Sequence, residues 1–162
     1  MTTNRKKMIN VFLAALLGGV ALLSQSAAAA DNSFKTEHVT TASNKSFEQA
    51  ADAIKQLVAQ NGMMVMAEVD QGKMLSMTGL SLKATLYLVG NPNVGKQLFE
   101  QNHAVGLYVP LRVFVYSDEK GKTFIAYDKP SSLLSQYRND KIAMVAQMLD
   151  QKLHDLVTMA AQ

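Results

Sequence analysis

The sequence predicts an α+β domain in which a mostly antiparallel sheet carries its helices on one face. Strand-like segments rich in β-branched and aromatic residues alternate with helix-like segments in the order β-α-β-β-α-β-β-α. Strands that follow one another directly favour antiparallel pairing, because parallel neighbours need a long crossover connection. Residues 118–121 (DEKG) fit a tight hairpin turn between two such strands.

Alternation and capping residues predict the first elements of this domain. Residues 34–41 alternate loosely and predict a strand. Ser46 is a favourable N-cap for a helix with regularly spaced apolar residues, and the Asn-Gly pair at residues 61–62 ends that helix. Residues 63–70 predict a second strand. Residues 73–83 fit either a loop or a single helical turn, and both interpretations stay open.

Three further strands and two helices complete the predicted domain. The strands are expected at residues 84–89, 105–117 and 122–128, and the helices at residues 93–102 and after Pro130. Pro110 interrupts the long strand, because proline cannot donate a backbone hydrogen bond. The last helix carries one apolar stripe, formed by Ile142, Val145, Met148, Leu149, Leu153, Leu156 and Val157.

Residues 1–30 have the three-part pattern of a secretory signal peptide. Arg5, Lys6 and Lys7 precede an apolar run at residues 8–23, and four alanines end the segment at Ala30. The apolar run is shorter than the roughly 20 residues of a bilayer-spanning helix. We therefore expect cleavage after Ala30, a single domain at residues 31–162, and a periplasmic or secreted product.

The charge balance argues against nucleic acid and membrane surfaces as partners. The whole sequence has 16 basic and 13 acidic residues, but three of the basic ones lie in the predicted signal peptide. The remaining domain therefore has 13 of each, without the basic patch of a nucleic-acid-binding protein. We expect no membrane attachment after cleavage. The sequence contains no cysteine, so we expect no disulfide.

Several motifs resemble a known family. They are Gly79-Leu80, LYLVGNP, Gly95, VPLRVFVYSDEKG and IAYDKPSSLL, in this order. Together they resemble the bacterial and archaeal domain-of-unknown-function family numbered 302. The resemblance implies an α+β fold of the TATA-box-binding-protein-like class and no agreed activity. Two positions depart from the family pattern: Gln71 replaces a histidine of many members, and Tyr108 replaces an acidic residue.

Arg112 is the first candidate for a ligand-binding residue. It lies inside the apolar segment LRVFVY, where a charge is costly unless it is paired. Asn91, Tyr116 and Tyr127 are its candidate neighbours in a site for an anionic ligand. The alternative is a structural arginine stacked on an aromatic ring or paired with an acidic residue such as Asp128.

Two other patterns have more ordinary explanations. Five methionines cluster between residues 63 and 77, and thioethers can bind Cu(I). Met64, Met66 and His103 are the weak candidates for such a site, but we expect the cluster to fill the core and to bind no metal. Residues 90–96 (GNPNVGK) resemble a phosphate-binding loop, yet Gln97 stands where that loop needs Ser or Thr. We expect a structural turn there.

The sequence contains no compact catalytic motif, such as G-x-S-x-G or a set of regularly spaced histidines. We therefore expect a non-enzymatic exported protein that binds a small molecule or serves as an accessory to another protein, with no cofactor. Two alternatives stay open: a small enzyme with a dispersed site, and a methionine-based protein that handles copper or haem. Homo-oligomerisation also stays open.

Overall fold

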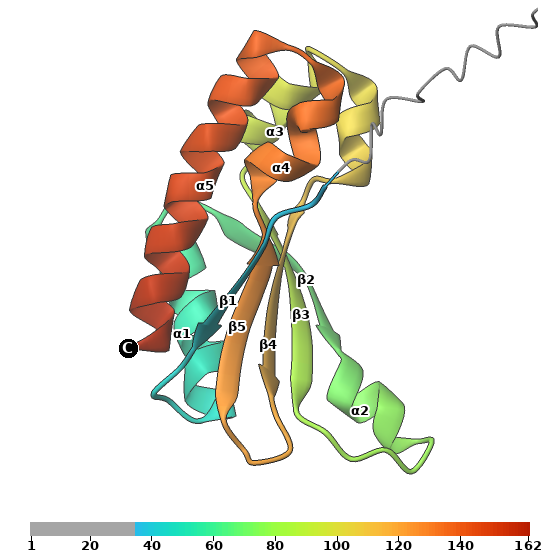
Figure 1. The fold of residues 1–162 in the computed structure, drawn as a ribbon, viewed down its shortest axis with the longest axis vertical. Helices are drawn as coiled ribbons and strands as arrows, with labels where there is room; N and C mark the ends of the chain where they lie inside the picture. Colours follow the sequence, from blue (N-terminus) through green and yellow to red (C-terminus); the bar gives the residue numbers. More distant parts are fainter. Residues whose placement is uncertain (1–34) are drawn as a thin grey trace, which may run out of the picture. The chain divides into compact units, whose positions relative to one another are not determined.

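The computed structural model describes residues 35–162, which form a five-stranded sheet and its helices (Figure 1). The predicted signal peptide lies outside the described residues. The strands are β1 (His38–Ala42), β2 (Met64–Asp70), β3 (Ala84–Gly90), β4 (Leu111–Ser117) and β5 (Thr123–Asp128). The helices are α1 (Phe47–Gln60), α2 (Gln71–Ser76), α3 (Pro92–Phe99), α4 (Pro130–Leu134) and α5 (Asp140–Ala161), with 3-10 turns η1 (His103–Leu107) and η2 (Ser135–Tyr137).

The sheet is antiparallel throughout, which confirms the predicted α+β class. Its strand order is β1-β5-β4-β3-β2, and each pair of neighbours is antiparallel. β4 and β5 form the predicted hairpin. The carboxylate of Asp118 accepts hydrogen bonds from the backbone N–H groups of Lys120 and Lys122, and these bonds stabilise the turn.

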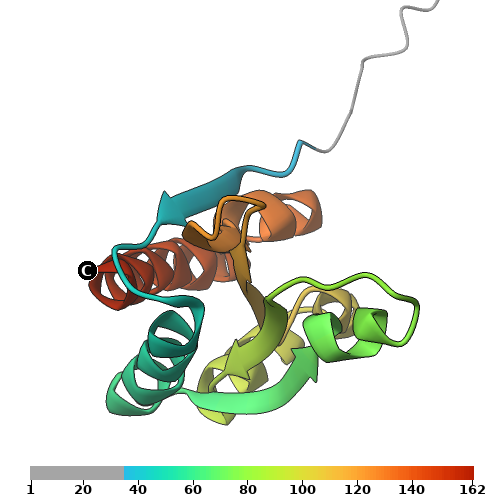
Figure 2. The same cartoon turned by 90° about the horizontal axis from the view of Figure 1, so that it is seen from below.

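α1 and α5 cover one face of the sheet, as the two views show (Figures 1 and 2). Ser46 caps α1 with a capping box: its hydroxyl accepts from the backbone of Gln49, and the Gln49 side chain accepts from the backbone N–H of Ser46. Strand alternation sends one set of side chains into this core. The largest buried members from the sheet and the two helices are Tyr87, Val89, Val113, Val115, Ile125, Ile54, Val58, Ile142, Leu153 and Leu156.

The other helices lie at the ends of the sheet. α3 and α4 lie at one end and α2 at the other (Figure 1). Both interpretations of residues 73–83 hold in part: residues 77–83 are turn and loop, and residues 73–76 belong to the helix α2, which begins earlier, at Gln71. The carboxylate of Asp70 caps it by accepting a hydrogen bond from the backbone of Lys73.

The prediction of a strand from residue 105 is wrong for its first part. Residues 103–107 form the 3-10 turn η1, and β4 begins at Leu111. The side-chain oxygen of Asn102 accepts from the backbone N–H of Ala104 and starts this turn. In this segment Val105 is fully buried and Val109 packs against the core, but Leu107 is 80% exposed, so the apolar residues do not share one buried strand face.

Candidate functional site

Arg112 lies on the sheet face opposite α1 and α5, which we call the open face. Its Nη2 donates a hydrogen bond to Asp128 Oδ2 at 3.0 Å, and His38 Nδ1 lies 3.0 Å from Asp128 Oδ1. The carboxylate of Asp128 on β5 thus contacts a side chain from each flanking strand, Arg112 from β4 and His38 from β1. The Arg112 side chain is 59% exposed and that of Asp128 is 20% exposed. Arg112 is therefore paired with Asp128, and its other N–H groups remain accessible to solvent.

Two hollows meet at the pair of Arg112 and Asp128. The first, of about 280 Å³, also includes His38, Gln71 and Phe114. The second, of about 390 Å³, lies toward η1, and its lining residues are Leu88, Gly106, Leu107, Tyr108, Val109, Pro110, Arg112, Asp128 and Leu133. The two departures from the family pattern, Gln71 and Tyr108, therefore each line a hollow beside the same arginine.

Tyr116 lies farther along the open face in a row of aromatic rings. Its ring stacks on Phe114 at a centroid distance of 5.1 Å and on Phe124 at 5.4 Å. The row continues the face on which Arg112 lies, since Arg112, Phe114 and Tyr116 alternate along β4. Leu86 and Leu88 of β3 are half-buried on the same face, so the surface is mixed apolar and aromatic.

Of the other two predicted neighbours of Arg112, Tyr127 lines the first hollow together with Arg112, whereas Asn91 lines neither of the two hollows. The side chain of Tyr127 belongs to the core, and burial raises its pKa above the ordinary value, with the nearby Asp150 as a smaller cause. Asn91 is the N-cap of α3: its side-chain oxygen accepts from the backbone N–H groups of Asn93 and Val94, and its amide donates to the carbonyl of Gly62. Asn91 lines a different cavity from the hollows around Arg112.

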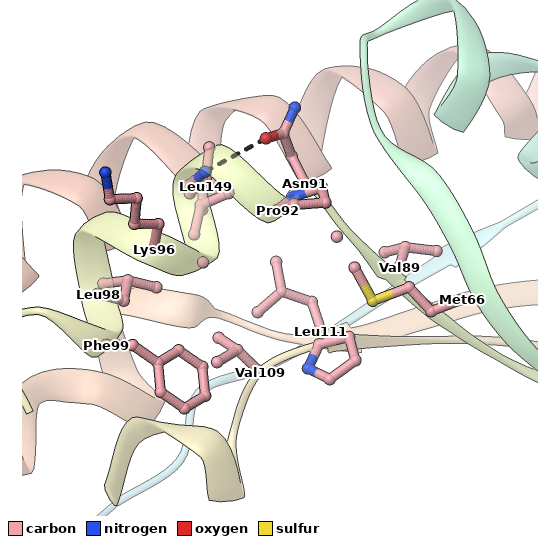
Figure 3. Close-up of a pocket in the computed structure, with 14 residues that line it drawn as sticks. Met66, Val89, Asn91, Pro92, Lys96, Leu98, Phe99, Val109, Leu111 and Leu149 are labelled. Atoms are coloured by element: carbon pink, nitrogen blue, oxygen red, sulfur yellow. Dashed lines mark hydrogen bonds between the residues drawn. The ribbon is translucent and has the colours of Figure 1, made fainter. Parts of the chain in front are cut away.

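That cavity lies beneath α3 and has a mainly apolar lining (Figure 3). Its volume is about 320 Å³, and it is partly open to solvent. Its wall comes from β2, β3, α3, the start of β4 and α5. The lining residues are Met66, Val89, Gly90, Asn91, Pro92, Val94, Gly95, Lys96, Leu98, Phe99, Val109, Pro110, Leu111 and Leu149.

The polar groups of this cavity are occupied or directed away from it. The side-chain oxygen of Asn91 caps α3, and its NH₂ group donates to the carbonyl of Gly62. The aliphatic stem of Lys96 lines the cavity, while its ammonium points away from Val109 and Leu111 (Figure 3) and lies 3.6 Å from the carboxylate of Glu100. The cavity thus offers an apolar surface without a group for acid–base chemistry. A small molecule could be held there mainly by burial of its apolar surface.

The sequence GNPNVGK that borders the cavity forms the turn and first helical turn of α3. Pro92 occupies the first position of the helix, where its missing N–H costs nothing. No close contact requires glycine at position 95, because a Cβ at Gly95 would meet no heavy atom within 4 Å. The space next to Gly95 belongs to the cavity that it lines.

The prediction that the clustered methionines fill the core is also wrong. Only Met63 is buried, whereas Met64, Met66, Met74 and Met77 are 46–82% exposed. Leucine, isoleucine and valine fill the space around α1 and α5, and four of the five thioethers lie outside that core. Met66 lines the cavity beneath α3, and His103 lines a shallow hollow with Lys96, Phe99 and Glu100. Within residues 35–162, no group of three or more His, Cys, Asp or Glu side chains could hold a metal ion.

Sequence reasoning missed this cavity because its wall combines segments that are far apart in the chain. Met66, Gly95, Leu111 and Leu149 belong to four different elements. The one local signal was Gly95, a glycine inside a short helix where alanine would be more favourable. Gly95 has no positive φ angle that would require glycine, and the space beside it is open.

The described part of the chain resembles proteins of one family. A model of the family described as "Domain of unknown function DUF302" matches residues 39–160. The crystal structure of an uncharacterized conserved protein DUF302 from Bacillus stearothermophilus superposes with a TM-score of 0.71 at 20% sequence identity. The match covers 77% of this chain and 98% of that one. This likeness shows that the two chains share a fold.

Longer proteins contain a similar segment. The fluoride-specific ion channel FluC 1 of Brucella suis is 29% identical over 100 residues, which make up 61% of this chain and 39% of that protein. The fluoride-specific ion channel FluC 2 of Brucella melitensis is 29% identical over 100 residues, or 37% of its length. The match thus spans about two fifths of these relatives. Between residues 35 and 162, none of the helices has the length and apolar character that a bilayer crossing requires.

Proposed function

Because the chain belongs to the DUF302 family, which is described only as a domain of unknown function, we propose a function from its geometry. The protein is an exported, non-enzymatic binding protein that holds a small, mainly apolar molecule in the cavity beneath α3. The observation that carries this proposal is the apolar wall of about 320 Å³ formed by five elements. That volume is at the lower end of the usual range for small-molecule sites, about 300–1,000 Å³.

The chemistry of the wall supports binding and not catalysis. Catalysis by proton transfer or nucleophilic attack needs a titratable or nucleophilic group directed at the ligand. Lys96 is the one charged residue in the lining, and its ammonium lies beside Glu100 and outside the cavity. The ligand therefore contacts mainly aliphatic carbon, together with the aromatic ring of Phe99.

Export is the second part of the proposal. It is supported by the charged, apolar and alanine-rich segments of residues 1–30. The mature chain would then start at Asp31 in the periplasm or outside the cell. A carrier of small apolar molecules is useful in such a compartment, because these molecules are poorly soluble in water and require an apolar surface to be held.

An accessory role is compatible with the same site. In the fluoride-specific channels of Brucella, the matching segment makes up 37–39% of the protein and is thus joined to further sequence. We propose that such a segment is an accessory binding domain there and that this chain acts through the same cavity. The name of the channels describes the whole proteins, so we extend no channel activity to this chain.

A fluorescent apolar probe tests the proposed binding. N-phenyl-1-naphthylamine brightens when it leaves water, and its titration gives a dissociation constant for the wild-type chain. Gly95→Leu places an isobutyl group at a position with no heavy atom within 4 Å, and it should therefore fill part of the cavity. We expect this variant to bind the probe at least about tenfold more weakly.

Gln97→Leu is the matched control, because it adds a leucine to the exposed side of the same helix. It should bind the probe like the wild type. Native mass spectrometry of protein purified from its own host then identifies a retained ligand. Equal probe binding by the wild type and Gly95→Leu would contradict the proposal, since the probe would then lie elsewhere.

A further inference from the structure

Met66 is a reactive thioether in the wall of the apolar cavity. It lies on β2 where the pairing with β3 is irregular, between Val65 and Ala67. A Cβ built at Gly90 would lie 3.2 Å from Met66 Cε and 3.7 Å from Met66 Sδ. The Met66 side chain therefore covers the backbone at the end of β3. The residue is nevertheless 46% exposed. Met66 thus contacts the cavity (Figure 3) and is open to small solutes.

Thioethers are the readily oxidised groups of this chain, because the sequence contains no cysteine. The reaction with a peroxide is simple. A sulfur lone pair attacks one oxygen of hydrogen peroxide, the S–O bond forms as the O–O bond breaks, and a proton moves to the departing hydroxide. The products are the sulfoxide and water, and the sulfur loses two electrons to the peroxide. Methionine sulfoxide reductases reverse this step.

We propose that Met66 is an oxidation site for peroxides and that its sulfoxide releases the molecule held beneath α3. This inference rests on the proposed binding function. The sulfoxide oxygen is a strong hydrogen-bond acceptor, and the surrounding wall of Val89, Pro110 and Leu111 has no side-chain donor for it. The oxygen either faces the cavity and makes it polar or turns to solvent and withdraws the side chain from the wall.

Both arrangements weaken the binding of an apolar ligand. A polar group that enters an apolar site without a partner is unfavourable, and a withdrawn side chain removes contact area from the ligand. We expect a loss of affinity of about tenfold or more. The fold itself should tolerate the reaction, because Met66 lies outside the core formed beneath α1 and α5 and Met63 is the buried methionine.

Met64 offers a matched control on the same strand. It is 50% exposed, so peroxide should reach it as easily as Met66, but it does not line the cavity. Leucine replaces methionine with little change in volume and removes the sulfur. Met66→Leu therefore removes an oxidisable group from the cavity wall, whereas Met64→Leu removes an oxidisable group from outside the cavity.

The test uses three proteins, wild type, Met66→Leu and Met64→Leu, each before and after hydrogen peroxide. Peptide mass spectrometry locates the added oxygen atoms, thermal melting checks the fold, and N-phenyl-1-naphthylamine reports the cavity. We expect the oxidised wild type and oxidised Met64→Leu to bind the probe about tenfold more weakly. Peroxide should not change the affinity of Met66→Leu from the value of the same variant before treatment, and methionine sulfoxide reductases should restore binding by the oxidised wild type.

Two results overturn the inference while leaving the binding function intact. In one, oxidised Met66→Leu loses the probe as strongly as the wild type does. In the other, Met66 stays unoxidised under conditions that oxidise Met64. A different result, no probe binding by any reduced protein, overturns the proposed function and this inference with it.

Discussion

Replacing Gly95 should make the protein more stable while it weakens ligand binding. Gly95 lies inside α3 at an ordinary helical backbone angle, and a Cβ there would meet no heavy atom within 4 Å. Leucine in place of glycine in a helix interior gains about 0.8 kcal/mol from helix propensity. Partial burial of its side chain in the cavity adds roughly 1 kcal/mol, and lost rotamer freedom removes about 0.5–1 kcal/mol. The net expectation is a gain of about 1 kcal/mol.

Urea unfolding followed by circular dichroism measures this change. For a domain of this size, the gain corresponds to a rise in melting temperature of about 4 °C. Gly95→Ala separates the two contributions, because it has the favourable helix propensity but leaves most of the cavity. It should raise the free energy of unfolding by about 0.5–1 kcal/mol and keep probe binding.

Gly72 provides a control position with the opposite expected result. Gly72 also lies in a helix, but a Cβ there would lie 2.5 Å from the carbonyl oxygen of Leu82. Gly72→Ala must therefore move the backbone after α2, and it should destabilise the protein. The reasoning is refuted if Gly95→Leu lowers the unfolding free energy, or if Gly95→Ala and Gly72→Ala change it in the same direction.

Three further predictions concern other parts of the chain. Arg112→Met should lower the unfolding free energy in urea by less than about 1 kcal/mol, because its pair with Asp128 is largely exposed; a larger loss would identify Arg112 as an important part of the scaffold. Burial raises the pKa of Tyr87 to about 12, while an unfolded tyrosine titrates near 10. The stabilisation by the protonated Tyr87 is therefore present below about pH 10 and lost as the pH rises toward 12. The urea midpoint should thus fall less steeply with pH in Tyr87→Phe than in the wild type, and equal slopes for both proteins would contradict this prediction. The exported protein should have the intact mass of a chain that starts at Asp31, and a mass that retains residues 8–23 would contradict the signal peptide.

Much of the fold was predictable because its signals are local. The capping residues Ser46 and Asn91 fix helix starts through side-chain hydrogen bonds within three residues. The alternation of β4 correctly placed Arg112, Phe114 and Tyr116 on one face. The strand order was not predictable in this way, because pairing of β1 with β5 joins residues about 90 positions apart.

The candidate site was harder to predict for the same reason. Residue type suggested that methionines fill the core, since methionine is usually buried. Whether a methionine is buried depends, however, on where its strand lies in the sheet. β2 is an edge strand, and its exposed residues include Met64. Likewise, Asn91 and Arg112 belong to two motifs that resemble the family, and we expected them in one site. In the structure, Asn91 lines the cavity beneath α3, and Arg112 lines the hollows of the open face.

The cavity and the open face share one strip of chain, and this decides how a retained ligand should be assigned. Val109 and Pro110 line both the cavity beneath α3 and the hollow beside Arg112. A substitution in this strip would disturb both places and could not separate them. Gly95 and Arg112 each line only one side, so Gly95→Leu and Arg112→Lys form a clean pair.

Native mass spectrometry of these two variants assigns the ligand. If the ligand lies in the cavity, Gly95→Leu loses it and Arg112→Lys retains it. Lysine keeps the positive charge but not the planar guanidinium, so an anionic ligand bound by Arg112 should be lost in Arg112→Lys and retained in Gly95→Leu. The second pattern would contradict the proposed apolar site and move the function to the open face. Because the two outcomes are opposite, one measurement distinguishes a carrier of apolar molecules from a protein that recognises anions.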